Sequence, residues 1–218
     1  MTMQNRFQAA LFDLDGVVFD TEPQYTIFWA EQGRLYHPEM PDFAQRIKGQ
    51  TLEQIYSGYF AGDLEKERAG ITCRLNEFEQ HMDFIYVSGF ESFVASLRKQ
   101  GLKTAVVTSS NQAKMEQVYV RRPEFKSLFD MILTAEDFAA SKPDPDCYLT
   151  AARRFALLPS DCLVFEDSIN GLKSGRAAAM TVVGLSTTND ESVISPLSDI
   201  VIADYEHLGR LQSMMNLE

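Results

Sequence analysis

Two aspartates that lie two residues apart, Asp13 and Asp15, directly follow a short apolar run near the start of the 218-residue chain. Residues two apart in an extended strand point to the same face, so both carboxylates could face one cleft at the end of a buried strand. Gly16 then allows a sharp turn. Such a pair suits a divalent cation, acid/base chemistry or a covalent acyl-type intermediate. A strand that simply runs into a polar loop would look the same, so the pair has to be judged with the rest of the chain.

Further polar residues follow other predicted strands. Thr108 comes after an apolar run over 102–107, and Glu166 and Asp167 come after another over 162–165. Lys142 lies in the loop beyond a short strand at 131–133. In open α/β sheets, ligands bind beyond the carboxyl ends of the strands, so these groups should meet at one edge of the sheet.

The order of the elements supports such a sheet. Apolar strands alternate with amphipathic helices from about residue 87 to the end, which is typical of a doubly wound α/β fold with a parallel sheet. The predicted strands after the first cover 102–107, 131–133, 162–165, 181–185 and 199–202, and the predicted helices cover 89–100, 112–121, 145–157, the segment after Ser168, and 205–215.

The segment between the first two strands has a different character. No β-like run occurs between residues 22 and 86, and helices are predicted from Pro23 to near Gly33, at 43–47, from Thr51, and from 64 to about 85. Thr51 with Gln54 three residues later fits a capping box. We therefore predict a catalytic core formed by residues 1–21 and 88–218, with residues 22–87 inserted as a small, all-helical cap domain.

The convergent set of residues indicates phosphoryl transfer. Carboxylates gathered at one place repel one another unless a cation lies between them, and hard oxygen ligands with few protein groups favour Mg²⁺ shared with a substrate phosphate. Thr108 and Ser109 precede a helix N-terminus, which suits an anion, and Lys142 adds a positive charge. With its ordinary pKa of about 4, Asp13 would be ionised at neutral pH and able to act as a nucleophile.

The composition limits the kinds of molecule that the protein is expected to bind. The net charge is −11, from 20 basic and 31 acidic residues, which argues against nonspecific binding to nucleic acid or to an anionic membrane. No apolar stretch approaches the roughly 18 residues of a membrane span, and the N-terminus lacks a signal-peptide pattern. We expect a cytoplasmic protein, monomeric by default, that binds a small phosphorylated metabolite.

Four motifs in order resemble the haloacid dehalogenase superfamily, in its phosphatase and beta-phosphoglucomutase-like branch. They are Phe12-Asp13-Leu14-Asp15-Gly16-Val17, Val107-Thr108-Ser109, Lys142-Pro143 and Phe165-Glu166-Asp167-Ser168, and the resemblance covers essentially the whole chain.

The resemblance implies a role for each motif. Asp13 would be the nucleophile that forms an aspartyl-phosphate, and Asp15 would be the acid and base, with its backbone carbonyl on Mg²⁺. Thr108 and the Ser109 backbone would bind the phosphoryl oxygens, and Lys142 would hold the nucleophile and the phosphate together. Mg²⁺ would be positioned by Asp167 with the assistance of Glu166, so that the predicted metal site comprises Asp13, Asp15, Glu166 and Asp167.

Two residues of the predicted cap indicate which reaction and substrate to expect. A beta-phosphoglucomutase has a histidine where this chain has Tyr25, and an arginine that clamps the distal phosphate where it has Leu52. These departures favour a phosphatase acting on a sugar phosphate; the alternatives are a sugar phosphomutase and a noncatalytic phosphometabolite-binding protein. Lys48 and Gln50 are candidates for substrate binding, and Asn111 either touches substrate or caps the helix that follows it.

Overall fold

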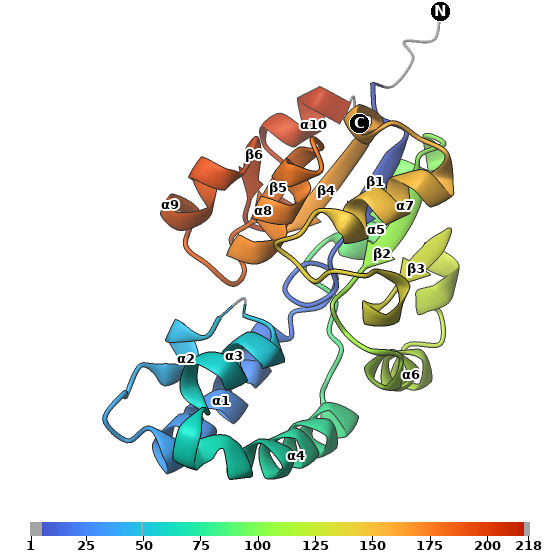
Figure 1. Ribbon diagram of the computed structural model, residues 1–218. Helices are drawn as coiled ribbons and strands as arrows, with labels where there is room; N and C mark the ends of the chain where they lie inside the picture. Colours follow the sequence, from blue (N-terminus) through green and yellow to red (C-terminus); the bar gives the residue numbers. More distant parts are fainter. Residues whose placement is uncertain (1–5, 49, 216–218) are drawn as a thin grey trace, which may run out of the picture.

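The computed structural model describes residues 6–48 and 50–215 of the chain. Two lobes make up the molecule (Figure 1): a sheet flanked by helices, and a smaller lobe built from helices alone, referred to below as the helical lobe (α1–α4). The predicted α/β fold with a doubly wound parallel sheet is confirmed. The helical block also lies where it was predicted, whereas the exact domain limits stay a prediction.

All strand pairs of the sheet are parallel, and its order is β3-β2-β1-β4-β5-β6. The first strand is therefore central, and every residue of it is buried, as parallel sheets covered on both faces require. The strands are β1 (Ala9–Phe12), β2 (Lys103–Val107), β3 (Met131–Leu133), β4 (Cys162–Glu166), β5 (Thr181–Leu185) and β6 (Ile200–Ile202).

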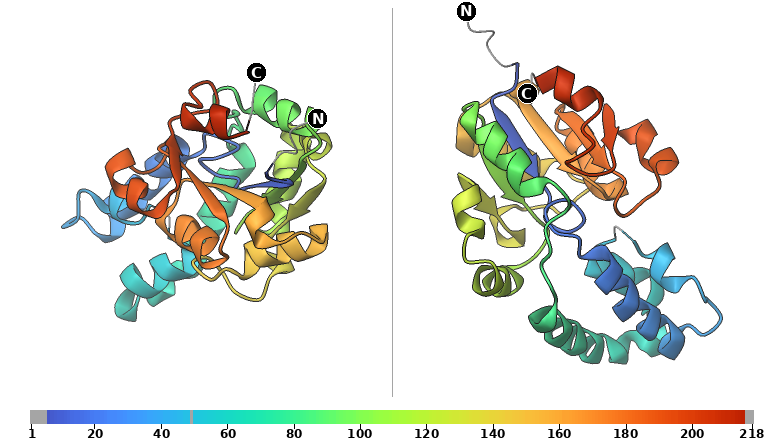
Figure 2. Two further views of the ribbon diagram at one scale, coloured as in Figure 1. Left: turned by 90° about the horizontal axis from the view of Figure 1, so that it is seen from above. Right: turned by 180° about the vertical axis from the view of Figure 1, so that it is seen from behind.

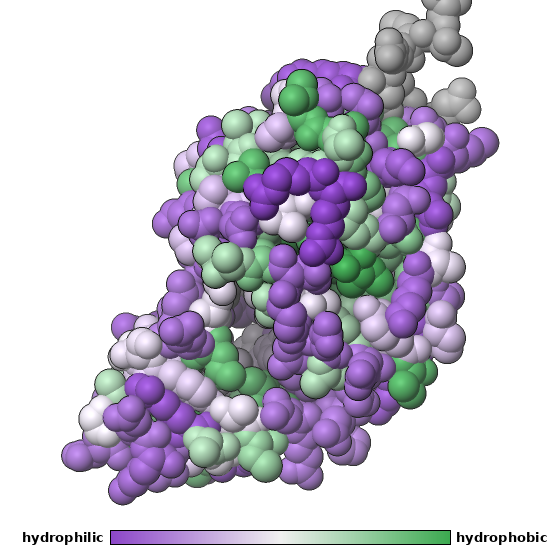
Figure 3. All heavy atoms as spheres, turned by 45° about the vertical axis from the view of Figure 1, so that its right-hand side comes forward, coloured by the Kyte–Doolittle hydropathy of each residue, from purple (hydrophilic) through white to green (hydrophobic). Residues whose placement is uncertain are grey.

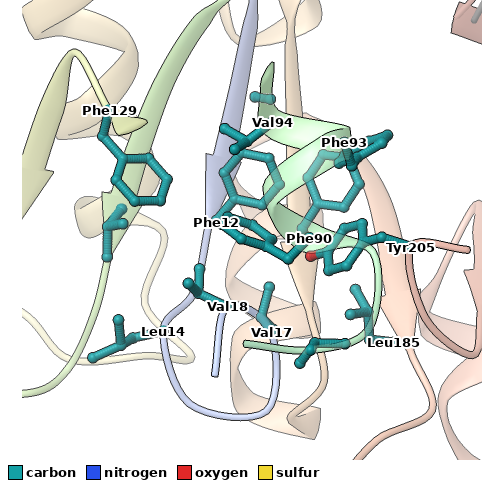
Figure 4. Close-up of a cluster of buried hydrophobic side chains, with 14 of the residues drawn as sticks. Phe12, Leu14, Val17, Val18, Phe90, Phe93, Val94, Phe129, Leu185 and Tyr205 are labelled. Carbon is teal, nitrogen blue, oxygen red and sulfur yellow. The ribbon is translucent and has the colours of Figure 1, made fainter. Parts of the chain in front are cut away.

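Helices cover the sheet on both faces. Phe12 and Leu11, adjacent in β1, belong to two different core clusters because successive side chains in a strand point to opposite faces. Phe12 stacks on Phe165 of β4 at 4.6 Å between ring centroids, and Figure 4 shows Phe12 among the side chains of Phe90, Phe93 and Tyr205. Figure 1 shows α7 and α8 in front of the sheet, and the view from behind in Figure 2 shows α5 in front. These helices and the remaining ones of this lobe are α5 (Phe90–Lys99), α6 (Gln112–Arg121), α7 (Asp146–Phe155), α8 (Ile169–Ala177), α9 (Glu191–Ile194) and α10 (Arg210–Met215).

The helical lobe has a small core of its own, in which Phe28, Trp29 and Phe43 are buried with aliphatic side chains. The capping box predicted at Thr51 and Gln54 is confirmed in both of its hydrogen bonds. The elements of this lobe are α1 (Glu22–Tyr36), α2 (Phe43–Arg46), α3 (Leu52–Tyr59), a 3₁₀ segment (Gly62–Glu67) and α4 (Arg68–His81).

Three predicted helix limits are wrong. Residues 64–85 are not one helix, because a 3₁₀ segment precedes α4 and α4 ends at His81. The chain after α4 runs beside the segment that follows β1, where the Val87 N–H donates to the Val18 carbonyl at 3.0 Å. The first helix runs past Gly33, and the last helix begins only at Arg210. None of the described helices combines the length and the apolarity needed to cross a bilayer.

Gly33 lies inside α1, and its lack of a side chain makes room for a residue of α2. A Cβ added at Gly33 would lie 2.7 Å from Cβ of Phe43, which is too close for any real contact. The glycine that looked like a helix end is therefore a packing position between α1 and α2.

We expect Gly33→Ala to lower the free energy of unfolding by about 1–2 kcal/mol, because overpacking outweighs the gain in helix propensity. Gly58→Ala in α3 is the matched control, since a Cβ at Gly58 meets nothing within 4 Å, and it should be neutral or slightly stabilising. Urea denaturation of both variants tests the pair. Equal effects of the two substitutions would contradict the packing role of Gly33.

Candidate active site

The carboxyl edge of the sheet faces the helical lobe across a cleft. Its volume is about 500 Å³, and the hollow between the two lobes is visible in Figure 3. The structure brings together residues that lie far apart in the sequence. All of the predicted site residues except Glu166, which lies beneath the cleft wall, line it: Asp13, Asp15, Lys48, Gln50, Thr108, Ser109, Asn111, Lys142 and Asp167.

Lys142 links two carboxylates. Its Nζ donates to Asp13 Oδ1 at 2.6 Å, to Glu166 Oε1 at 2.7 Å and to the Val107 carbonyl at 3.0 Å. These are the three donors of an ammonium, all used within the protein. Burial acts to lower the pKa of Lys142, but Asp13 and Glu166 outweigh it, and the pKa rises above its usual value. Lys142 is thus a permanent cation beside Asp13.

Glu166 is completely buried and saturated with donors. Its Oε1 also accepts from the Tyr148 hydroxyl at 2.7 Å, and its Oε2 accepts from the N–H groups of Asp167 and Ser168 and from the Ser168 hydroxyl. In this arrangement Glu166 holds Lys142 in place, and its predicted role at a metal stays a prediction.

The charge of the acidic cluster is only partly offset by Lys142. One oxygen from each of Asp13, Glu166 and Asp167 lies within 4.8 Å of the others. Burial raises the pKa of Asp13 to about 7, although Lys142 opposes the rise, and burial together with Glu166 and Asp13 raises that of Asp167 well above its usual value. Burial thus opposes the ionisation that we expect for Asp13 from its ordinary pKa, and its role as the nucleophile stays a prediction. Carboxylate oxygens gathered in this way match the donor set of Mg²⁺.

The loop after β5 closes the site from one side. The Thr188 hydroxyl donates to Asp167 Oδ2, and the Asn189 side chain donates to the Asp167 carbonyl at 3.0 Å. Gly16, with φ at +73°, lies against the same carboxylate, and a Cβ there would be 2.0 Å from Asp167 Oδ2. The glycine after the aspartate pair is thus required both for the turn and for the approach of Asp167.

Asp15 has partners different from those of Asp13. Its Oδ1 accepts from the Thr21 hydroxyl at 2.7 Å, and its Oδ2 accepts from Lys114 Nζ at 2.6 Å and from the Ser110 hydroxyl at 3.3 Å. The two aspartates of the opening motif are therefore each paired with a lysine of their own. This separation allows them to perform different tasks.

The segment after β2 forms a turn that precedes α6. Thr108 is buried, and its Oγ1 accepts from the Ser110 N–H at 3.0 Å, whereas Ser109 is exposed to the cleft. Asn111 accepts from the Lys114 N–H at 2.9 Å and so caps α6. The capping interpretation of Asn111 is correct, and contact with a substrate stays a prediction.

Lys48 and Gln50, the two predicted site residues of the helical lobe, line the cleft and contact backbone carbonyls. Lys48 Nζ lies 3.5 Å from the Thr188 carbonyl, and the Gln50 side chain donates to the Arg46 carbonyl at 3.0 Å. Their predicted roles in substrate binding remain untested by the geometry.

Sequence reasoning missed three residues of the site: Lys114, Tyr148 and Thr188. Thr188 could have been found, because it follows a predicted strand whose carboxyl end belongs to the same edge of the sheet. Lys114 lies three residues after the cap Asn111 and Tyr148 lies within α7, and a polar residue within a helix carries no signal of this kind. Only the packing of those helices reveals them.

The chain is similar to known proteins over most of its length. The sequence model of a family described as "Haloacid dehalogenase-like hydrolase" matches residues 10–185. The chain is 26% identical to a validoxylamine A 7'-phosphate phosphatase of Streptomyces hygroscopicus subsp. limoneus, over 93% of this chain and 99% of the relative. It is 29% identical to a beta-phosphoglucomutase of Bacillus subtilis (strain 168), over 79% of each. The fold is similar to that of a HAD hydrolase, family IA, variant 3 from Entamoeba histolytica, with a TM-score of 0.78, 21% identity, and coverage of 97% of this chain and 99% of that one.

We expect Lys142→Met to lower the free energy of unfolding by about 3–5 kcal/mol in metal-free buffer, since it leaves the buried Glu166 and the partly buried Asp13 without their cation. Lys173→Met, at an exposed position of α8, is the matched control and should change stability by less than about 0.5 kcal/mol. Urea denaturation of the two variants provides the comparison. A loss of similar size in both would show that Lys142 does not offset the charge of the cluster.

Proposed function

The chain belongs to the haloacid dehalogenase-like hydrolase family, and from this membership we propose that it hydrolyses phosphate monoesters of small metabolites through an aspartyl-phosphate on Asp13. One observation carries the proposal: Asp13 and Asp15 share a cleft, but each has its own lysine partner. A nucleophile beside a permanent cation and a second carboxylate held separately are what two-step phosphoryl transfer needs.

Each step is assigned to groups of the chain. An Asp13 oxygen attacks phosphorus, the ester P–O bond breaks, and the leaving oxygen takes a proton from Asp15. Water then attacks the phosphorus of the aspartyl-phosphate and gives its proton to Asp15, while the bond between phosphorus and Asp13 breaks. Thr108 and Ser109 lie where they could hold the phosphoryl oxygens, and Lys142 keeps Asp13 oriented.

The residues fit Mg²⁺. Carboxylate oxygens of Asp13 and Asp167 and, by family resemblance, the Asp15 carbonyl would hold it. Burial and the neighbouring carboxylates raise the pKa values of Asp13 and Asp167, so a further cation beside Lys142 would stabilise the ionised carboxylates. When bound, the ion offsets the charge of these carboxylates and of the phosphoryl group. Thr188 and Asn189 orient Asp167 for this purpose.

Charge in the cleft supports a substrate with a single phosphate. Glu22, Glu53 and Glu79 line the helical side of the cleft, and Lys48 is the one lysine or arginine of the described helical lobe that does so. Leu52, at the position where a mutase would have its arginine, also lines it. A second phosphate would meet repulsion there, whereas hydroxyl groups can donate to the carboxylates. This favours a monophosphorylated sugar or sugar alcohol as the substrate. The names of the validoxylamine A 7'-phosphate phosphatase and the beta-phosphoglucomutase also point to small phosphorylated metabolites.

A sugar phosphomutase is the second candidate, favoured by the similarity to a beta-phosphoglucomutase. Mutase chemistry requires that a bisphosphate bind with either end at Asp13. The carboxylates on the helical side of the cleft make that less favourable than reaction with water, so hydrolysis is the preferred proposal.

We expect Mg²⁺ to stabilise the protein, by about 1–3 kcal/mol at ten- to a hundredfold excess over its dissociation constant. Asp167→Asn should abolish this stabilisation, and the metal-free variant should be at least as stable as the wild type because the substitution relieves charge repulsion. Thermal denaturation with Mg²⁺ and with chelator measures both effects. An unchanged response to Mg²⁺ in the variant would remove Asp167 from the site.

A phosphate-release screen tests the activity itself. With Mg²⁺, hexose, pentose and hexitol monophosphates should release phosphate at least about tenfold faster than sugar bisphosphates, and chelator should stop the release. Asp13→Asn should lower kcat by about a thousandfold or more, whereas Asp63→Asn, at an exposed position of the helical lobe, should not.

The outcome separates the candidates. Interconversion of glucose 1-phosphate and glucose 6-phosphate, stimulated by a bisphosphate and seen by NMR, would favour the mutase. Absence of any phosphate release or interconversion over the whole screen would leave the noncatalytic binding protein.

A further inference from the structure

Lys114 is a buried lysine that none of the four motifs contains. It lies in the first turn of α6, its side chain is 4% exposed, and its Nζ donates at 2.6 Å to Asp15 Oδ2 and at 2.6 Å to the Tyr25 hydroxyl. Burying a long cationic side chain is unfavourable unless it is paired. Here the pairing is with the residue that must exchange protons in the proposed reaction.

The contact extends into the helical lobe. The Tyr25 hydroxyl, on α1, donates to Glu79 Oε1, on α4, at 2.7 Å. The direction of each bond is determined, because an ammonium only donates and a carboxylate only accepts. Burial raises the pKa of Tyr25 well above its usual value, and the charges of Asp15 and Glu79 add to the rise, so the phenol keeps the proton that it donates. Tyr25 therefore presents a lone pair to Lys114.

These bonds hold the Asp15 carboxylate from two sides. Thr21 contacts one of its oxygens, and Lys114 and Ser110 contact the other. In the second half of the proposed reaction, Asp15 is the base that the attacking water needs.

From this geometry we propose that Lys114 is a positioning residue for the second half of the reaction. It holds the Asp15 carboxylate in place to receive the proton of the water that hydrolyses the aspartyl-phosphate, and Tyr25 and Glu79 of the helical lobe hold Lys114 in turn. The proposal rests on the proposed phosphatase function. In the step concerned, the water oxygen bonds to phosphorus, the bond from phosphorus to Asp13 breaks, and one water proton goes to Asp15.

p-Nitrophenyl phosphate separates the two half-reactions, because nitrophenolate leaves without a proton and the first step then needs no acid. We expect Lys114→Met to lower kcat by about 10–100-fold and to lower KM in parallel, so that kcat/KM stays within about threefold. A rapid burst of nitrophenolate equal to the enzyme concentration should precede slow turnover. Lys173→Met should match the wild type.

Tyr25→Phe removes only the phenol oxygen and keeps Lys114. It should lower kcat for p-nitrophenyl phosphate about 2–10-fold with kcat/KM unchanged. If kcat and kcat/KM fall together in Lys114→Met without a burst, Lys114 is structural and the proposal is overturned. If Lys114→Met behaves as expected but Tyr25→Phe leaves kcat unchanged, the helical lobe does not help to position Lys114.

A crystal structure of Lys114→Met gives a readout independent of turnover. In the wild type, the Asp15 carboxylate should accept a hydrogen bond from the Ser110 hydroxyl, whereas in the variant this hydrogen bond should be lost. An Asp15 side chain in the same position in both structures would contradict the proposal. If the wild type releases no nitrophenolate with Mg²⁺ and also fails the metabolite screen, the proposed function fails. The position of Asp15 in the two structures would still decide whether Lys114 positions it.

Discussion

The structure of the site depends on how buried carboxylates are kept together. One oxygen each from Asp13, Glu166 and Asp167 lies within 4.8 Å of the others, where like charges repel strongly because little water screens them. Lys142 offsets part of this repulsion by donating to two of the three. A divalent cation would offset the rest of the repulsion, so under the proposed function the arrangement that is unfavourable in the free protein would be the one that binds metal and phosphate.

The parallel sheet makes this crowding possible. Because β1 is central and pairs with both β2 and β4, the residues after these strands lie side by side although they are far apart in the sequence. The stacking of Phe12 on Phe165 packs the two strands that carry the acidic residues. The hydrophobic core thus supplies the rigidity that holds the carboxylates against their repulsion, in line with the usual placement of sites at the carboxyl edge.

The helical lobe contributes in two ways that the core cannot. Its carboxylates give the outer cleft a negative character, which under the proposed function would discriminate among substrates by charge and not only by shape. Tyr25 also contacts Lys114 and is itself held by Glu79, so hydrogen bonds connect the helical lobe to Asp15, the acid and base of the proposed reaction. Under that proposal, substrate selection and proton transfer would be coupled through a few side chains.

The sequence by itself determined the α/β class, the parallel sheet, the insertion of a helical block and the convergence of Asp13, Thr108, Lys142 and Asp167, because strand periodicity and the edge rule place residues that follow strands. It did not determine that the first helix continues past Gly33, that Tyr148 donates to Glu166, or that Asp15 pairs with Lys114. Those depend on which side chains of separate helices meet. Periodicity indicates which face of a helix is buried, but the partner of a buried polar group is selected by packing between segments distant in sequence, and only the tertiary structure decides it.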